Sequence, residues 1–124
     1  MFRGDSFLFT VVLYETEDGK TPVEDWMDSL EPKMRAKLIA MLLLLEEKGN
    51  ALRKPYTESL GDGIFELRAI QGNNISRALF FFYFNQRIIV TNGSVKKQRK
   101  TPASEIQLAK ERRMDFLRQE KNKA

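Results

Sequence analysis

The second half of the chain contains three consecutive strand patterns joined by very short turns, and no other feature restricts the fold as much. Residues 64–70 alternate apolar and polar side chains, residues 74–84 are dominated by aromatic residues, and residues 87–95 open with a β-branched run. The connections around residues 72–73 and 85–86 are short enough for hairpins. The sequence therefore predicts a meander of antiparallel strands.

The segment before this meander predicts one strand and two helices. Residues 7–14 read FLFTVVLY, a composition typical of a strand. Helices are predicted to begin at Pro22 and Pro32, because proline is favoured at the first helical position, and the second helix is predicted to end at Gly49. Residues 50–63 contain a proline and two glycines and predict a loop.

A third helix is predicted to begin after Pro102. The order β-α-α-β-β-β-α predicts a single α+β domain over residues 1–124, with its core in about residues 7–119. We expect the helical hairpin and the C-terminal helix to pack on one face of a small, mainly antiparallel sheet.

Composition excludes several classes of enzyme. The 124-residue chain has no cysteine and no histidine, which excludes disulfides, zinc enzymes, Ser-His-Asp hydrolases and ribonucleases that use a pair of histidines. We predict neither a metal nor a cofactor. The longest apolar run, around residues 39–45, is far too short to span a bilayer, and the N-terminus lacks a secretory pattern. The sequence predicts a cytoplasmic protein without a membrane partner.

Positive charge is concentrated in the last quarter of the chain. Residues 1–95 carry 11 Lys/Arg and 13 Asp/Glu, a net charge of −2, whereas residues 96–124 carry 10 and 4, a net charge of +6. Such an asymmetry favours a polyanionic partner, most often nucleic acid. The alternative interpretation is a solvated helix with a frayed end.

Strand pairing brings charged residues together. A hairpin closing on residues 72–73 places Arg68 opposite Arg77, and one closing on residues 85–86 places Arg77 opposite Ser94, with Lys96 diagonal to it. Glu66 shares this face, which we expect to be the solvent side of the sheet. The opposite face would carry the core residues Leu67, Ala69, Ala78, Phe80 and Phe82.

Two opposed arginines repel each other, and such a local penalty is typical of functional sites. The cations could hold a phosphodiester and stabilise charge that develops during its cleavage. Tyr83 could stack on an unpaired base. Leu79 and Phe81 on the same face are better interpreted as a second small core under the third helix. The alternative interpretation of the charged face is a solvated, salt-bridged surface in which Glu66 neutralises Arg68.

A basic run precedes the third helix. Lys97, Arg99 and Lys100 follow Lys96 and could steer phosphates towards the site. Charged residues at a strand end also prevent edge-to-edge aggregation, and both interpretations can hold together.

Four motifs occur in this order along the chain: residues 62–68 (DGIFELR), 76–81 (SRALFF), 95–102 (VKKQRKTP) and 105–110 (EIQLAK). Together they resemble the RelE/ParE toxin superfamily, most closely its phage-derived HigB-like branch. The resemblance implies a compact RelE-like α+β fold and a cognate helix-turn-helix antitoxin (HigA-like). It also implies metal-independent cleavage of mRNA on the ribosome.

The resemblance assigns roles at matching positions only. Arg77 matches a strand arginine thought to bind the scissile phosphate, Arg68 a basic residue on the preceding strand, and Lys96 or Lys97 a basic residue at the end of the last strand. Some relatives use a histidine or a C-terminal tyrosine for proton transfer, and this chain has neither there. Glu66 or a lysine is the remaining candidate.

These features lead to the hypothesis of a type II toxin that cleaves mRNA through attack of a 2′-hydroxyl on the adjacent phosphate. Two alternatives remain open. One is a non-catalytic, ParE-like inhibitor of a protein such as DNA gyrase, and the other is an inactive phage-derived RNA-binding protein.

Overall fold

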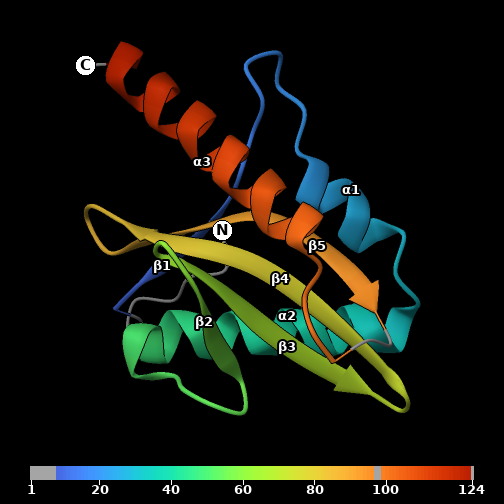
Figure 1. Cartoon of the computed structure of the whole chain (residues 1–124). Helices are drawn as coiled ribbons and strands as arrows, with labels where there is room; N and C mark the ends of the chain where they lie inside the picture. Colours follow the sequence, from blue (N-terminus) through green and yellow to red (C-terminus); the bar gives the residue numbers. More distant parts are fainter. Residues whose placement is uncertain (1–7, 97–98, 124) are drawn as a thin grey trace.

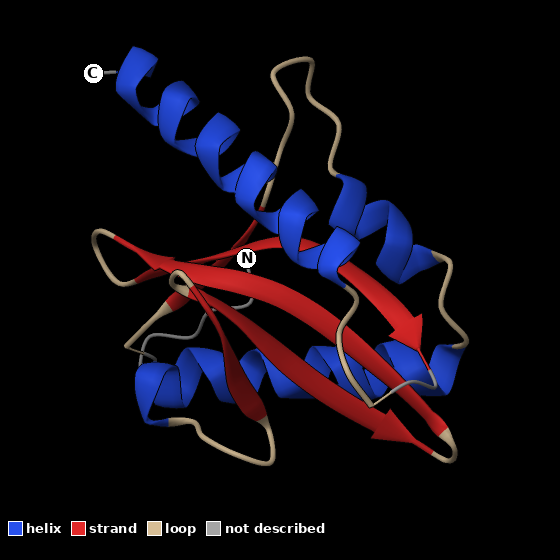
Figure 2. Cartoon of the chain, in the orientation of Figure 1, coloured by secondary structure: helices blue, strands red, loops and turns tan. Residues whose placement is uncertain are grey.

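The computed structural model describes residues 8–96 and 99–123 and confirms the predicted α+β order (Figures 1 and 2). The elements are β1 (Thr10–Leu13), α1 (Pro22–Asp28), α2 (Pro32–Lys48), the 3₁₀ turn η1 (Gly49–Ala51), β2 (Thr57–Gly61), β3 (Ile64–Gln71), β4 (Asn74–Tyr83), β5 (Arg87–Lys96) and α3 (Ala103–Lys123). Both predicted proline starts are correct, since Pro22 and Pro32 open their helices. No helix of the described ranges is long and apolar enough to cross a membrane.

The loop prediction for residues 50–63 is wrong in its second part. Residues 57–61 form β2, which pairs antiparallel with β3. Its five residues, TESLG, lack the β-branched and aromatic enrichment that marks a strand in sequence. Pairing with β3 therefore determines the strand, and local propensity does not.

The five strands form one sheet in the order β1-β5-β4-β3-β2. β1 runs parallel to β5, and the other pairs are antiparallel, so the sheet is mainly antiparallel as predicted. β1 and β2 are the two edges of this sheet.

Helices cover both faces of the sheet, which corrects the expectation of a single covered face (Figure 1). α1 and α2 pack on one face, where Leu38, Leu42 and Leu45 join the sheet residues Leu67 and Phe80. α3 crosses the other face and buries Ala109 and Phe116 against Leu79, Phe81 and Ile89. The interpretation of Leu79 and Phe81 as a second core is confirmed. Alternation along β4 explains both layers, because its even positions face α2 and its odd positions face α3.

The predicted pairing of the central strands is confirmed at the charged positions. Arg68 lies opposite Arg77, and Arg77 lies opposite Ser94. The second hairpin differs near its turn, where Tyr83 pairs with Arg87 and leaves three residues in the loop. A bulge at Thr91 shifts the register back by one residue, so the two deviations cancel at Arg77.

Candidate functional site

Four charged residues form a compact group on the α3 side of the sheet, which we call the charge cluster: Glu58 of β2, Glu66 and Arg68 of β3, and Arg77 of β4. Glu66, Arg68 and Arg77 share one face because Glu66 and Arg68 are two residues apart and Arg68 pairs directly with Arg77. Glu58 pairs with Glu66 across the β2–β3 ladder. The predicted juxtaposition of Glu66, Arg68 and Arg77 is therefore correct.

Their exposure is not as predicted. The side chains of Glu66 and Arg77 are each only 1% exposed, and that of Arg68 is 26% exposed. Residues 99–102, which we call the covering segment, and α3 lie on this side of the sheet, and Thr101 itself is buried. The expectation of a solvent-facing cluster is therefore wrong for Glu66 and Arg77, because the chain folds back over them after β5.

The carboxylate of Glu66 is the centre of the cluster. Its Oε2 accepts a hydrogen bond from Nε of Arg68 at 2.6 Å, and its Oε1 lies 3.8 Å from Nε of Arg77. The hydroxyl of Thr101 donates to the same Oε1. Nη2 of Arg68 donates to Oε1 of Glu58 at 2.7 Å. Two carboxylates thus balance two arginines, and this explains how opposed cations are tolerated on adjacent strands.

Arg77 is also tied to the covering segment. Its Nη2 donates to the backbone carbonyl of Arg99 at 2.7 Å. Together with the bond from Thr101 to Glu66, this contact fixes the covering segment over the cluster. The interpretation that Glu66 neutralises Arg68 is correct. Glu66 lies beneath the covering segment, however, so the pair is not part of a solvated surface.

The basic residues around the cluster differ in position. Arg99 and Lys100 are exposed on the covering segment. Lys96 is the last residue of β5, but its side chain lies outside the described part of the chain, and so does Lys97 altogether. The structure thus leaves the predicted lysines of the site untested.

Tyr83 does not belong to the cluster. It lies six residues from Arg77 along β4, which corresponds to roughly 20 Å of strand. Its ring packs edge-on against Phe116 with centroids 5.0 Å apart, and the guanidinium of Arg87 lies 4.8 Å above it. Tyr83 therefore belongs to the far end of the α3 core, away from the charge cluster, and its stacking on an unpaired base stays a prediction.

Two residues of the site were missed in the sequence. The sequence predicts a loop at Glu58 and no site role for Thr101, whereas both side chains contact the charged residues of the site. The order Thr-Glu-Ser-Leu at residues 57–60 alternates weakly and was the only local signal for Glu58. The role of Thr101 depends on tertiary packing and has no local signal.

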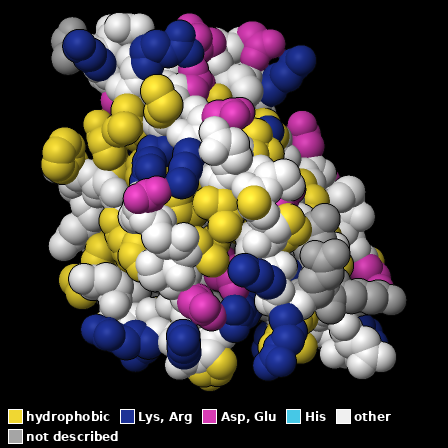
Figure 3. Space-filling model, viewed as in Figure 1, with side chains coloured by type: hydrophobic (Ala, Val, Ile, Leu, Met, Phe, Trp, Pro, Cys, Tyr) yellow, Lys and Arg dark blue, Asp and Glu magenta, His cyan; other side chains and the backbone are white. Residues whose placement is uncertain are grey.

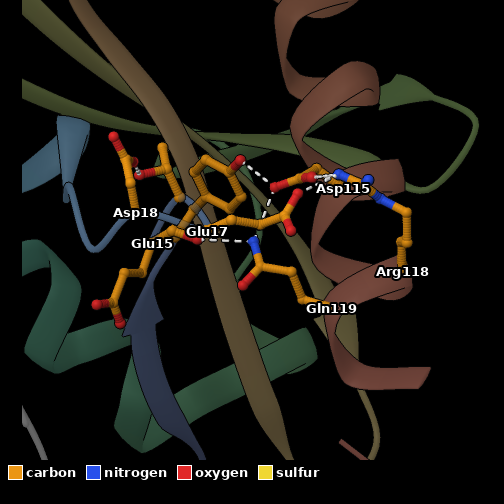
Figure 4. Close-up of polar contacts among 8 residues, drawn as sticks. Glu15, Glu17, Asp18, Asp115, Arg118 and Gln119 are labelled. Atoms are coloured by element: carbon orange, nitrogen blue, oxygen red, sulfur yellow. Dashed lines mark hydrogen bonds and ion pairs between the residues drawn. The ribbon is translucent and has the colours of Figure 1, made fainter. Parts of the chain in front are cut away.

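A second polar network fixes the other half of α3 (Figure 4). The hydroxyl of Tyr14 donates to Asp115, and Gln119 donates to the backbone carbonyl of Glu15 at 3.0 Å. Arg118 bridges Asp115 and Glu17. Burial, then the hydrogen bond to Asp115, raises the pKa of Tyr14 to about 12, and the same bond is the main reason that the pKa of Asp115 is lowered. This network joins the β1–α1 connection to α3.

Positive charge on α3 is largely used within the fold. Lys110 pairs with Asp62 at 2.8 Å, and Arg112 donates to the carbonyl of Thr91 at 2.9 Å. On the face drawn in Figure 3, Lys and Arg side chains form several separate groups with Asp and Glu between them. The described part of α3 therefore supports the interpretation of a solvated, internally paired helix better than that of a continuous basic stripe.

The described residues contain no group of three or more acidic side chains that could hold a metal ion. A small mixed sheet with helices in this order, carrying paired strand arginines around a glutamate, defines a small α+β protein with helices on both faces of one sheet. The model of the family described as "Phage derived protein Gp49-like (DUF891)" matches residues 25–114, and the chain belongs to this phage-derived, RelE-type toxin-like family. No curated protein matches the chain. The matched span includes the whole charge cluster and the covering segment.

Proposed function

We propose that this protein is the toxin of a type II toxin–antitoxin pair, of the HigB-like branch, and that it cleaves mRNA on the ribosome in the cytoplasm. The observation that carries the proposal is the pair of directly opposed arginines, Arg68 and Arg77, around Glu66 in a chain of a RelE-type family. Its partner would be a helix-turn-helix antitoxin (HigA-like).

The proposed reaction is an in-line attack of a 2′-hydroxyl on the neighbouring phosphate. The O2′–P bond forms and the P–O5′ bond breaks, which gives a cyclic phosphate and a 5′-hydroxyl. Arg68 and Arg77 would stabilise the additional negative charge on the phosphate oxygens. Glu66 would accept the proton of the 2′-hydroxyl, and Lys96 or Lys97 would protonate the leaving oxygen.

The covering segment must yield to substrate in this proposal. A phosphate that reaches Arg77 competes with the carbonyl of Arg99 for Nη2, and a charge-assisted bond to phosphate is the stronger of the two. Arg68, already 26% exposed, would meet the RNA first. Because such an opening costs free energy, positioning of the mRNA by the ribosome would have to contribute much of the rate.

The test is cleavage in a translating extract, with mRNA ends mapped after the addition of purified protein. We expect new ends with the wild type, and a loss of roughly 100-fold in cleavage rate for Arg68→Ala and Arg77→Lys. Arg87→Ala is the matched control, because Arg87 is a strand arginine of similar exposure that pairs with Glu120 far from the cluster. Thermal unfolding of each variant separates loss of function from loss of fold. Messages that stay intact, or full cleavage by folded Arg77→Lys, would refute the proposal.

A second candidate is a non-catalytic inhibitor of a protein target such as DNA gyrase. Burial of Glu66 and Arg77 in a balanced cluster favours it, because such a cluster also serves purely to fix the fold. DNA supercoiling in cells that express the protein distinguishes the two candidates. Relaxed or linearised plasmid with intact mRNA would support the inhibitor.

A further inference from the structure

A cavity of about 580 Å³ opens beside the edge strand β2, mainly on the side of the sheet opposite Glu66 and Arg77, and Glu58 is the one member of the charge cluster among its lining residues. It is bounded by η1, the segment leading to β2, and the α2-facing side of β3 and β4. Its volume falls within the range of about 300–1,000 Å³ that is typical of ligand-binding cavities.

Aromatic rings form the inner wall of this cavity. Phe65 stacks on Phe80 with centroids 5.6 Å apart and an interplanar angle of 21°. Phe82 meets both rings edge-on at 5.5 and 5.6 Å. Phe80 is buried in the main core, and Phe65 and Phe82 are only partly buried. The wall is thus a fixed apolar surface open on one side, which suits a large apolar side chain.

Strand β2 forms a second wall and is an edge of the sheet. The backbone N–H of Arg68 donates to the carbonyl of Tyr56, which sets the hydrogen-bonding phase of the β2–β3 ladder, while the N–H groups of Tyr56 and Thr57 both donate to the carbonyl of Arg53. Alternation then directs the backbone groups of Thr57 and Ser59 away from β3, towards the outside of the sheet. Ser59 is exposed, so its outward N–H and C=O can pair with another extended segment.

The cavity is lined by two basic residues and by one acidic residue, Glu58, whose carboxylate is paired with Arg68. Arg53 and Lys54 both line it and are exposed. Neither forms an ion pair with any residue in the part of the chain that the structure describes. Two uncompensated cations beside an apolar cavity favour a segment that carries acidic residues next to its apolar anchor.

We propose that this cavity and the outer edge of β2 bind a short extended segment of an acidic protein partner. A large apolar side chain of that segment enters the cavity against Phe65 and Phe82. Its backbone pairs with Ser59, and its acidic residues meet Arg53 and Lys54. This interaction goes beyond mRNA cleavage and does not require Glu66, Arg68 or Arg77, although Glu58 lines the cavity.

The test is an NMR titration of the ¹⁵N-labelled full chain with an amidated, extended peptide that has one central phenylalanine flanked by aspartate and glutamate. We expect chemical shift changes at Leu52, Ser59 and Phe82, and little change at Arg68 or Arg77. A peptide with serine in place of phenylalanine should bind at least several-fold more weakly, and so should one with lysines in place of the acids.

Three variants of the chain sharpen this test. The double variant Arg53→Glu/Lys54→Glu should lower the affinity roughly ten-fold at low salt. Ser59→Pro, which removes the outward N–H, should lower it without a change of charge. Lys33→Glu/Lys37→Glu is the matched control, because it makes the same charge change at exposed positions of α2 away from the cavity and should leave the affinity unchanged.

Several outcomes would overturn the proposal. They are equal binding of all three peptides, shifts confined to other surfaces, and tighter binding of a single-stranded oligoribonucleotide at the same residues. Chemical shift changes that depend on protein concentration in the absence of peptide would also overturn it, since they would show that the outer edge of β2 binds a second copy of the chain. Because Arg53→Glu/Lys54→Glu should still cleave mRNA and Arg77→Lys should still bind peptide, failure of this proposal is distinguishable from failure of the proposed nuclease.

Discussion

Replacing Glu66 by glutamine is the most informative single perturbation of the charge cluster. The substitution keeps the shape of the side chain but removes the negative charge between two arginines. Removing one partner of a buried ion pair costs about 3–5 kcal/mol, because the other charge is left uncompensated. Since glutamine can still accept one hydrogen bond and Arg68 keeps Glu58, we expect the lower end of this range, about 3 kcal/mol.

Glu58→Gln is the matched control for this experiment. Glu58 bonds to the same Arg68, but its side chain is 35% exposed whereas that of Glu66 is 1% exposed. Arg68 and Glu58 are both partly exposed, and since an ion pair that solvent screens contributes about 0–1 kcal/mol, the two substitutions should differ by about 2 kcal/mol.

Urea unfolding at neutral pH measures both free energies. The denaturation midpoint should fall far more for Glu66→Gln than for Glu58→Gln, with the dependence on urea unchanged for both. Equal losses for the two variants, within about 0.5 kcal/mol, would show that burial of Glu66 does not determine the stability of the cluster.

Three further predictions concern the packing of the helices. Phe116→Ala should lower the free energy of unfolding by about 3 kcal/mol, since it removes the buried ring that holds α3; a thermal melt within 2 °C of wild type would contradict this. Gly93→Ala should cost about 2 kcal/mol, because a Cβ there would lie 2.2 Å from the ring of Trp26; denaturant unfolding measures it, and Trp26→Leu should partly restore stability. The pKa of Tyr14 is raised to about 12 in the folded chain, so the stabilisation by its hydroxyl is full below pH 10 and is lost as the pH rises from about 10 to about 12. The difference in unfolding free energy between wild type and Tyr14→Phe should therefore shrink across that interval. A constant difference would contradict the raised pKa of Tyr14.

The sequence was sufficient to place Arg68 opposite Arg77, because a two-residue turn at Gly72 and Asn73 leaves only one register for the hairpin. The pairing of Arg77 with Ser94 is also predicted correctly, although the prediction assumes a two-residue turn before β5. The turn before β5 has three residues, and the bulge at Thr91 compensates. Bulges leave little trace in a sequence, so that agreement depended on two opposite deviations.

Burial of the charge cluster could not be predicted from the local sequence pattern. It depends on the covering segment and α3 returning over the sheet, contacts that join residues far apart in the chain. One sequence signal was nevertheless present. Residues 78–83 (ALFFFY) are apolar at even and odd positions alike, which is typical of a strand covered on both faces. That run predicts a second core under the third helix, as the interpretation of Leu79 and Phe81 states, and this is incompatible with the expectation that all helices pack on one face.

The parallel pairing of β1 with β5 has a consequence for synthesis of the chain. Thr10 can pair with Arg87 only after most of the polypeptide has been synthesised, and α3 is synthesised later still. A nascent chain therefore exposes the apolar odd positions of β4 and its unshielded arginine until the final helix leaves the exit tunnel. Products that terminate before Ala103 keep that surface in contact with water, so premature termination yields aggregation-prone fragments instead of a working protein.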